Sequence, residues 1–135
     1  MIAVLDTTAF SAAMRYEETL LNYLRSRRPG DVATVEPVIA EVEYGIQRLP
    51  EGSRHRRLLE DEKRRLLDEI RVLEWAPEAS RLFGAMKAHL EHSGTPIDDF
   101  DILIAAIAGS HGAEVITANL AHFVRIPGIT ARHWQ

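Results

Sequence analysis

Three acidic residues stand next to apolar segments that a folded protein would bury, and their side chains are the best candidates for chemistry. Asp6 follows four apolar residues, Glu41 stands between apolar neighbours, and Asp101 directly precedes an apolar run. A carboxylate in such a position loses hydration unless hydrogen-bond donors or a cation compensate. Three inward carboxylates also repel one another, and a divalent cation with oxygen ligands relieves that repulsion. The three residues therefore predict a Mg²⁺ or Mn²⁺ site capable of metal-assisted phosphodiester hydrolysis.

Each acid also has a purely structural explanation, which the residue types alone leave open. Asp6 could cap a following helix by accepting from backbone amides, and Glu41 could be an ordinary exposed helical glutamate. Asp98, Asp99 and Asp101 could simply favour a helix N-terminus through the helix dipole. Against the last alternative, Asp101 shares a helical face with Asp98 and abuts the apolar run, which would turn its side chain inward.

The elements that would position these acids alternate between strand and helix. Apolar runs predict strands at residues 2–5, 32–35, 70–75, 113–117 and 129–134. Periodicity and capping signals predict a helix after residue 6, capped by a threonine, and helices at about 16–28 and 77–92. Two more helices are expected to begin at residue 36 and at about residue 53, and a last one is expected to end at residue 108.

This alternation predicts an α/β fold with right-handed crossovers and a central, mainly parallel sheet covered by helices on both faces. In such sheets the ligand crevice lies beyond the carboxyl ends of the strands. Asp6 and Thr117-Ala118-Asn119 both follow predicted strands, so we expect them to meet at that edge.

Composition is typical of one folded domain spanning residues 1–135. The chain is 46% hydrophobic and 27% charged, and it contains no cysteine. A disulfide, a thiol nucleophile and a thiolate metal site are thereby excluded, and a cytoplasmic location is the simplest expectation. The N-terminus has no basic leader and no apolar run is long enough to cross a bilayer, so we expect no membrane association.

The net charge of −4 argues against binding nucleic acid by bulk attraction, so any RNA contact must be local. Residues 51–75 hold seven Lys or Arg residues against seven acids. Such mixing is typical of a solvated helix face, and a phosphate-contacting face is the alternative. His89 and His92 have a helical spacing that could bind a metal, but their surroundings are typical of a surface turn.

Other catalytic classes lack their required residues. There is no Gly-rich phosphate loop, no Gly-x-Ser-x-Gly and no His-Glu-x-x-His. A phosphorylation receiver needs a lysine at a late strand end, but Lys63 and Lys87 fall on predicted helices. A haloacid-dehalogenase-like phosphotransferase needs a second Asp two residues after the first, where Thr8 stands.

Four segments in order then carry a family resemblance that covers essentially the whole chain. They are Leu5-Asp6-Thr7-Thr8, Ala40-Glu41-Val42-Glu43-Tyr44-Gly45, Asp101-Ile102-Leu103-Ile104-Ala105-Ala106 and Thr117-Ala118-Asn119. With Phe123, Pro127-Gly128 and the closing Trp134, the chain resembles the PIN-domain ribonucleases, specifically the VapC and FitB type toxins. Each segment alone is weakly specific, but the four at these spacings are strongly so.

The resemblance implies a PIN-like three-layer α/β/α domain and a Mg²⁺- or Mn²⁺-dependent endoribonuclease that cleaves RNA, often a tRNA or ribosomal RNA. It also implies a homodimer and silencing by a small antitoxin. By position, Asp6, Glu41 and Asp101 match the family's most regular acids and would be both catalytic and metal-binding. The supporting polar residues expected around them are Thr7, Thr8, Asp98, Asp99, Thr117 and Asn119.

The chain departs from the family pattern where many relatives carry a fourth acid, because it has Asn119 and then His122. We therefore expect a weak second metal site. His122 is interpreted as a surface loop residue, with a proton shuttle or loose ligand as the alternative. The competing function is a non-catalytic PIN-fold module that binds RNA or a partner. A buried carboxylate cluster without a use would be costly to fold, which argues against this alternative.

Overall fold

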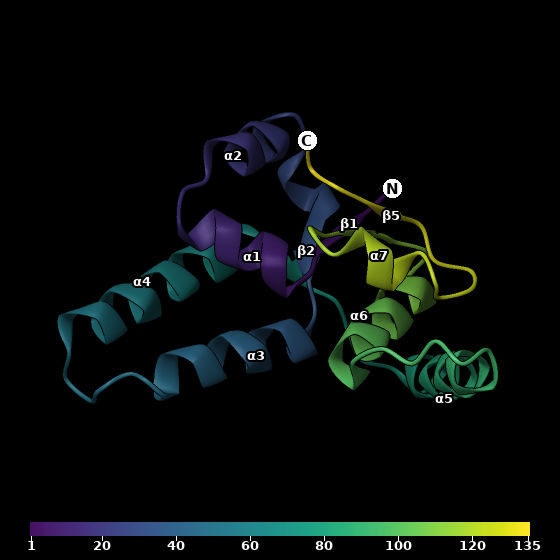
Figure 1. Cartoon of the computed structure of the whole chain (residues 1–135). Helices are drawn as coiled ribbons and strands as arrows, with labels where there is room; N and C mark the ends of the chain where they lie inside the picture. The colour runs from purple at the N-terminus through teal and green to yellow at the C-terminus, as the bar shows by residue number, and fades with distance from the viewer.

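A five-stranded parallel sheet forms the centre of the molecule (Figure 1). The computed structural model describes residues 1–135, and every neighbouring pair of strands in it is parallel. The strands are β1 (Ala3–Leu5), β2 (Val32–Thr34), β3 (Arg71–Val72), β4 (Glu114–Ile116) and β5 (Ala131–Arg132), in the order β3-β2-β1-β4-β5. Residues of β1, β2 and β4 are all buried, as expected for parallel strands covered on both faces. The predicted α/β class is confirmed.

Helices cover the two faces of the sheet. They are α1 (Thr7–Met14), α2 (Glu18–Arg25), α3 (Glu36–Gln47), α4 (Arg54–Glu69), α5 (Pro77–His92), α6 (Asp99–Ser110) and α7 (Leu120–Phe123), with a 3₁₀ turn at Pro29–Asp31. The chain steps from β1 to β3 in one direction and from β3 to β5 in the other. Right-handed crossovers therefore put α1–α4 on one face and α5–α7 on the other, the separation seen in Figure 1.

Several predicted boundaries were wrong. The helix expected at about 16–28 begins only at residue 18, because Tyr16 adopts the left-handed backbone conformation with φ 59° and separates α1 from α2. The strands expected at 70–75 and 129–134 shrink to the two-residue edge strands β3 and β5. Helix α7 was not anticipated. The cap of α1 is Asp6 and not a threonine, because the Asp6 carboxylate accepts from the Ala9 amide.

The hydrophobic core holds the site-bearing elements in place. Phe10 of α1, Ile104 of α6 and Phe123 of α7 are fully buried in one apolar cluster with the strands. Burying such side chains contributes roughly 1.5–3 kcal/mol each. Helix α6 is buried along nearly its whole length after its first turn, so its N-terminal acids are rigidly placed. None of the helices is long and apolar enough to cross a membrane.

The order of the strands reverses between β1 and β4, which are neighbours in the sheet. A crevice forms beyond the carboxyl ends of the strands at such a reversal. Asp6 follows β1 and Thr117 follows β4, and the Asp6 amide donates to the carbonyl of Ile116 at 3.1 Å. The fold therefore brings both residues to the same edge, as the sequence predicted.

Candidate active site

Asp6 is the most deeply buried acid of the chain, with 1% of its surface exposed. Its Oδ1 accepts from the Thr8 hydroxyl at 2.6 Å and from the Ala9 amide at 2.9 Å. Burial raises the pKa of Asp6 above its ordinary value, whereas hydrogen bonds from Thr117, Thr8 and Ala9 lower it in part. The negative charge of Asp101 raises the pKa further. Asp6 is thus both a helix cap and a carboxylate whose ionised form is under-compensated.

Two threonine hydroxyls hold Asp6 in position and are themselves fully used. Thr8 Oγ1 accepts from the Ala118 amide at 2.9 Å while it donates to Asp6. Thr117 is completely buried, and its hydroxyl accepts from the Asn119 amide at 2.8 Å. The start of α1 and the residues after β4 are therefore locked together around one carboxylate.

Glu41 comes to the same edge from α3. The Thr7 hydroxyl donates to Glu41 Oε1 at 2.5 Å, although the two residues are 34 positions apart in sequence. Burial raises the pKa of Glu41, the Thr7 hydrogen bond opposes that rise, and the charges of Asp101, Asp98 and Asp6 add to it. Glu41 is therefore a partly buried carboxylate that faces three other acids and not the freely exposed helical glutamate of the alternative interpretation.

Asp101 lies in the first turn of α6 with 16% of its side chain exposed. His122 Nδ1 lies 3.0 Å from Asp101 Oδ2, and because a carboxylate only accepts, the imidazole donates to it. The interpretation of His122 as a loop residue was wrong, because it belongs to the short helix α7 and contacts Asp101. Its signal in the sequence was weak, since the four-residue helix that carries it has too few positions for periodicity.

The structure brings only some of the remaining predicted residues to the other acids. Asp98 caps α6 by accepting from the Phe100 amide at 2.8 Å, and its charge acts on Glu41. Asp99 instead pairs with Lys87 at 3.0 Å on the exposed surface, so the structure does not bring it into the cluster. Asn119 is exposed beside the site, where its backbone carbonyl accepts from the His122 amide at 3.0 Å.

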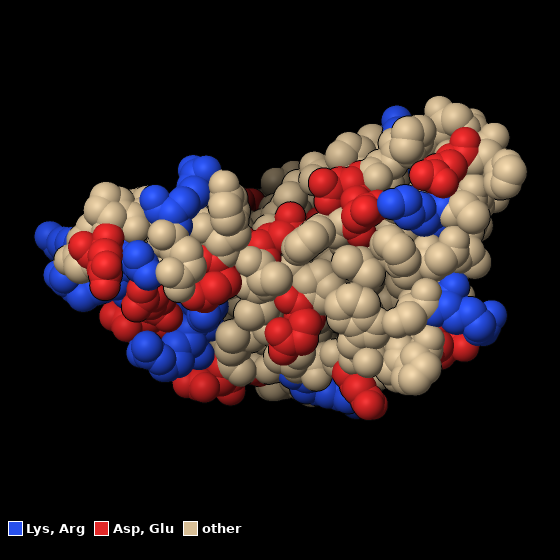
Figure 2. All heavy atoms as spheres, turned by 90° about the horizontal axis from the view of Figure 1, so that it is seen from below, with Lys and Arg blue, Asp and Glu red and all other residues tan.

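The carboxylates of Asp6, Glu41, Asp98 and Asp101 form a negatively charged centre, called the acidic centre below. They come from separate parts of the chain. Figure 2 shows acids over the middle of this face with few Lys or Arg residues between them, whereas both signs are mixed at the α3–α4 end. No three acidic or histidine side chains converge into a complete metal cage made of protein ligands alone. Mg²⁺ does not require such a cage, because it usually binds through one or two carboxylates and keeps several waters. Burial and mutual repulsion oppose the ionisation of these carboxylates, and a divalent cation would offset both effects. The oxygen donors present therefore fit such a cation.

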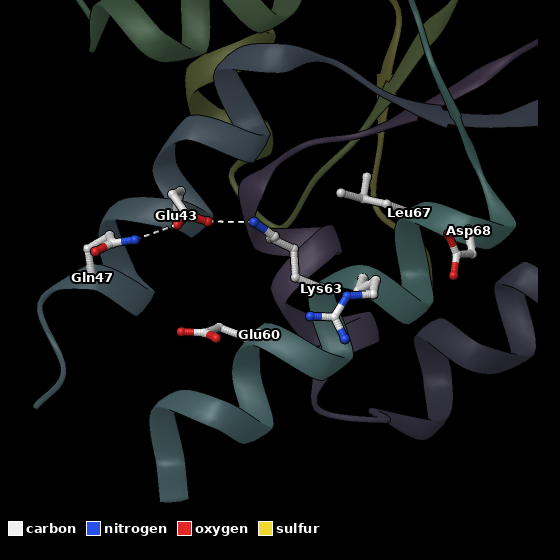
Figure 3. A pocket seen from close by; sticks show the side chains of 7 residues that line it. Glu43, Gln47, Glu60, Lys63, Leu67 and Asp68 are labelled. Atoms are coloured by element: carbon white, nitrogen blue, oxygen red, sulfur yellow. Dashed lines mark hydrogen bonds and ion pairs between the residues drawn. The ribbon is translucent and has the colours of Figure 1, made fainter. Parts of the chain in front are cut away.

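Several basic residues of α4 are paired with acids of α3 and α4 and not with this centre. Lys63 reaches across to Glu43 of α3, which also accepts from Gln47, as Figure 3 shows. Arg56 pairs with Glu60 at 3.2 Å, and Arg65 pairs with Glu62 at 2.8 Å. These contacts agree with a solvated, internally paired helix face.

Residues 3–129 match the family model described as "PIN domain". The chain belongs to the PIN domain family. Among curated relatives of this PIN domain, the tRNA(fMet)-specific endonuclease VapC of Salmonella typhimurium is 33% identical over 96 residues, covering 71% of this chain and 70% of the relative. Ribonuclease VapC2 of Rickettsia felis is 25% identical and covers 100% of this chain and 99% of the relative.

Solved structures agree with this assignment. This PIN domain superposes with a TM-score of 0.85 on a chain of the DNA-bound VapBC complex from Salmonella typhimurium, at 27% identity over 100% of this chain and 99% of that one. A chain of the promoter-bound VapBC2 complex from Rickettsia felis gives a TM-score of 0.90 at 24% identity, with complete coverage of both chains. The second likeness shows a shared fold. The expected PIN-like architecture is confirmed.

Proposed function

We propose that the protein is a metal-dependent endoribonuclease, the toxin of a toxin–antitoxin pair, whose Asp6, Glu41 and Asp101 hold a catalytic Mg²⁺ or Mn²⁺. The observation that carries the proposal is the mutual effect of these acids. Each comes from a different element, and the charge of Asp101 raises the pKa of both Asp6 and Glu41. A bound divalent cation would stabilise all three ionised forms at once.

Each residue has a distinct part in this proposal. The hydroxyls of Thr8 and Thr117 orient Asp6, Thr7 orients Glu41, and the His122 imidazole orients Asp101. Such outer contacts restrict the rotamers of metal-binding carboxylates and tune their basicity. When bound, the cation supplies charge stabilisation for the scissile phosphate and lowers the pKa of water.

RNA is the substrate class that the relatives support. The relatives from Salmonella typhimurium and Rickettsia felis carry the names tRNA(fMet)-specific endonuclease and ribonuclease, respectively. We propose that this chain also cleaves a structured RNA such as a tRNA or ribosomal RNA. An enzyme that cleaves a tRNA or ribosomal RNA would act in the cytoplasm.

We also propose an antitoxin partner and a homodimer. Chains with this fold occur in VapBC complexes, including two that are bound to DNA. A segment of the partner that offers an arginine to the acidic centre would form charge-assisted hydrogen bonds with the carboxylates. Light scattering at micromolar concentration tests the homodimer, and a monomer alone would contradict it. Expression that is harmless without any antitoxin would contradict the toxin role.

The nuclease activity is tested with the variants Asp101→Asn and Asp99→Asn. Both acids lie in the first turn of α6, but only Asp101 faces the cluster while Asp99 pairs with Lys87. RNA cleavage by the wild-type protein should require added Mg²⁺ or Mn²⁺ and stop with chelator. Asp101→Asn should lower RNA cleavage by more than about 100-fold, which is the upper end of the loss when a residue that only supports a metal ligand is replaced. Asp99→Asn should keep its activity. Cleavage that survives thorough chelation would refute the metal mechanism, and a folded protein that binds RNA without cutting it would favour the binding module.

A further inference from the structure

A cavity of about 380 Å³ opens directly beside the acidic centre, between α1, α3 and α4. Thr7 and Glu41, which form the short hydrogen bond described above, belong to its lining. The volume lies within the range of pockets that hold small ligands or parts of larger ones. An occupant of this cavity would therefore lie next to a substrate bound at the acids.

The chemistry of the lining differs sharply from that of the acidic centre. Apolar side chains, including Val42, Ile46 and Leu59, contribute to the walls. The polar lining adds Arg15 directly after α1, Arg48 directly after α3 and His55 of α4. Glu41 is the sole acid, so the cavity is locally cationic in a chain of net charge −4.

Two of these basic groups have no partner in the protein. Arg48 and His55 take part in none of its side-chain hydrogen bonds or ion pairs, unlike Arg56 and Lys63 nearby. Arg15 has one contact, a 3.6 Å pair with Glu17, and keeps 63% of its side chain exposed. Arg48 and His55 are therefore free to contact an anionic ligand, and Arg15 is exposed enough to do so beside its pair with Glu17.

A glycine keeps the cavity open. Gly45 lies in α3, where glycine costs helix stability relative to alanine. A Cβ placed on Gly45 would meet no atom within 4 Å, and its φ is not positive, so neither packing nor backbone conformation requires glycine. The residue does leave room in the cavity that a larger side chain would fill.

We propose that this cavity is a nucleobase pocket for the RNA strand beside the scissile phosphate, an inference that rests on the proposed ribonuclease function. The apolar walls would receive an unstacked base, His55 would offer a ring for stacking, and Arg15 and Arg48 would contact the flanking phosphates. A single-stranded polyanion with flat apolar bases is complementary to an apolar cavity with a cationic rim. Its backbone would then continue to the carboxylates at Glu41.

The pocket is tested by filling it with the variant Gly45→Leu, with Gly84→Leu as the matched control. Gly84 lies inside α5, and a Cβ there also meets nothing within 4 Å, but it does not line the cavity. Binding of a short fluorescein-labelled single-stranded RNA is measured with chelator present, so that no cleavage occurs. Gly45→Leu should weaken binding at least about fivefold, the lower end of the loss for one stacked base, and Gly84→Leu should bind as wild type. Thermal melting should show both variants folded and at least as stable as wild type, because leucine favours helix over glycine.

A second arm tests the cationic rim without relying on cavity filling. The double variant Arg15→Ala/Arg48→Ala should bind the same RNA more weakly and reduce the slope of log affinity against log salt by about 0.7 per lost phosphate contact. Arg28→Ala is the control, since Arg28 is also exposed and unpaired but precedes β2 at the opposite edge of the sheet.

Four results are decisive and separable. Weaker RNA binding by the pocket and rim variants, with normal binding by both controls, supports the nucleobase pocket. RNA affinity unchanged in the folded Gly45→Leu variant overturns it, as does a loss confined to binding of a partner protein. A wild-type protein that binds RNA through this pocket but never cleaves it with Mn²⁺ would refute the nuclease mechanism while leaving the pocket in place.

Discussion

His122 Nδ1 donates to Asp101 Oδ2 across 3.0 Å, joining α7 to the first turn of α6. His122 keeps 45% of its side chain exposed, whereas Asp101 keeps only 16%. The imidazole therefore covers an acid of the cluster from the solvent side. His122 stands at a position where the resemblance leads us to expect a fourth acid, and this chain has a hydrogen-bond donor there instead.

His122→Ala should reduce Mn²⁺ affinity or RNA cleavage by about 10- to 100-fold, because Asp101 loses the donor that orients it. His122→Asn should recover much of the loss, since its amide can donate from nearly the same position as Nδ1. Metal titration and cleavage rates measure both variants. His111→Ala is the control, because that histidine contacts the Glu74 carbonyl away from the acids. Equal activity of His122→Ala and wild type would show that the contact is incidental.

Thr8→Val should impair the site without unfolding the protein. The substitution keeps the side-chain shape but removes the donor to Asp6 and the acceptor for the Ala118 amide. We expect a loss of about 10- to 100-fold in activity, and Thr8→Ser should restore most of it because the hydroxyl returns. A Thr8→Val protein with wild-type activity would contradict the role of the hydroxyl.

Metal-free stability should depend on pH through Asp6 and Glu41. Their pKa values are raised above the ordinary 3.8 and 4.5, mainly by burial, so between those values and the raised ones the folded protein binds more protons than the unfolded chain. The contribution of these two groups to the free energy of unfolding therefore falls as pH rises through that window.

Asp6→Asn isolates this effect, because asparagine still caps a helix but cannot ionise. With chelator present, the stability of the variant relative to wild type should increase as pH rises above about 4, and then level off. Urea unfolding at a series of pH values measures the difference. A difference that is constant or decreases with pH would contradict the assigned direction. Saturating Mn²⁺ should stabilise wild type more than the variant.

Asn119→Asp should tighten metal binding. The Asn119 side chain is exposed beside the acids and provides no capping hydrogen bond for α7. A carboxylate there would add charge and a stronger ligand for a hard cation than a neutral amide oxygen. Calorimetric titration of Mn²⁺ without RNA compares the two proteins. Two tight sites in the wild-type protein would mean that another residue already replaces the missing acid, with Asp98, whose charge acts on Glu41, as the first candidate.

The sequence predicted the positions that depend on strong local signals. Asp6 and Thr117 follow buried apolar strands, and Asp101 lies in the first turn of a helix that is buried and apolar beyond it, so alternation and strand polarity brought them to one edge. Contacts between segments far apart in the sequence were harder to predict. The Thr7–Glu41 hydrogen bond spans 34 positions, and its partners depend on how α1 packs against α3.

The errors have equally specific causes. Helix α7 is only four residues long, so His122 had no periodic pattern to reveal its helix or its direction. Asp99 and Asp101 lie two positions apart in α6, so they face different sides of the helix, and Asp99 pairs with Lys87 of α5 on the exposed surface. The edge strands β3 and β5 contain two residues each and pair with one neighbour, so the apolar runs that predicted longer strands extend beyond the paired segments.

The catalytic role of the acid cluster is tested most directly by single-turnover RNA cleavage at increasing Mn²⁺ with wild type, Glu41→Gln and Glu43→Gln. The two glutamates lie two positions apart on α3, but Glu41 faces the other acids while Glu43 pairs with Lys63. Glu41→Gln should require much more Mn²⁺ and lose more than about 100-fold in rate, whereas Glu43→Gln should match wild type. A folded Glu41→Gln protein with wild-type rate and metal dependence would contradict the account.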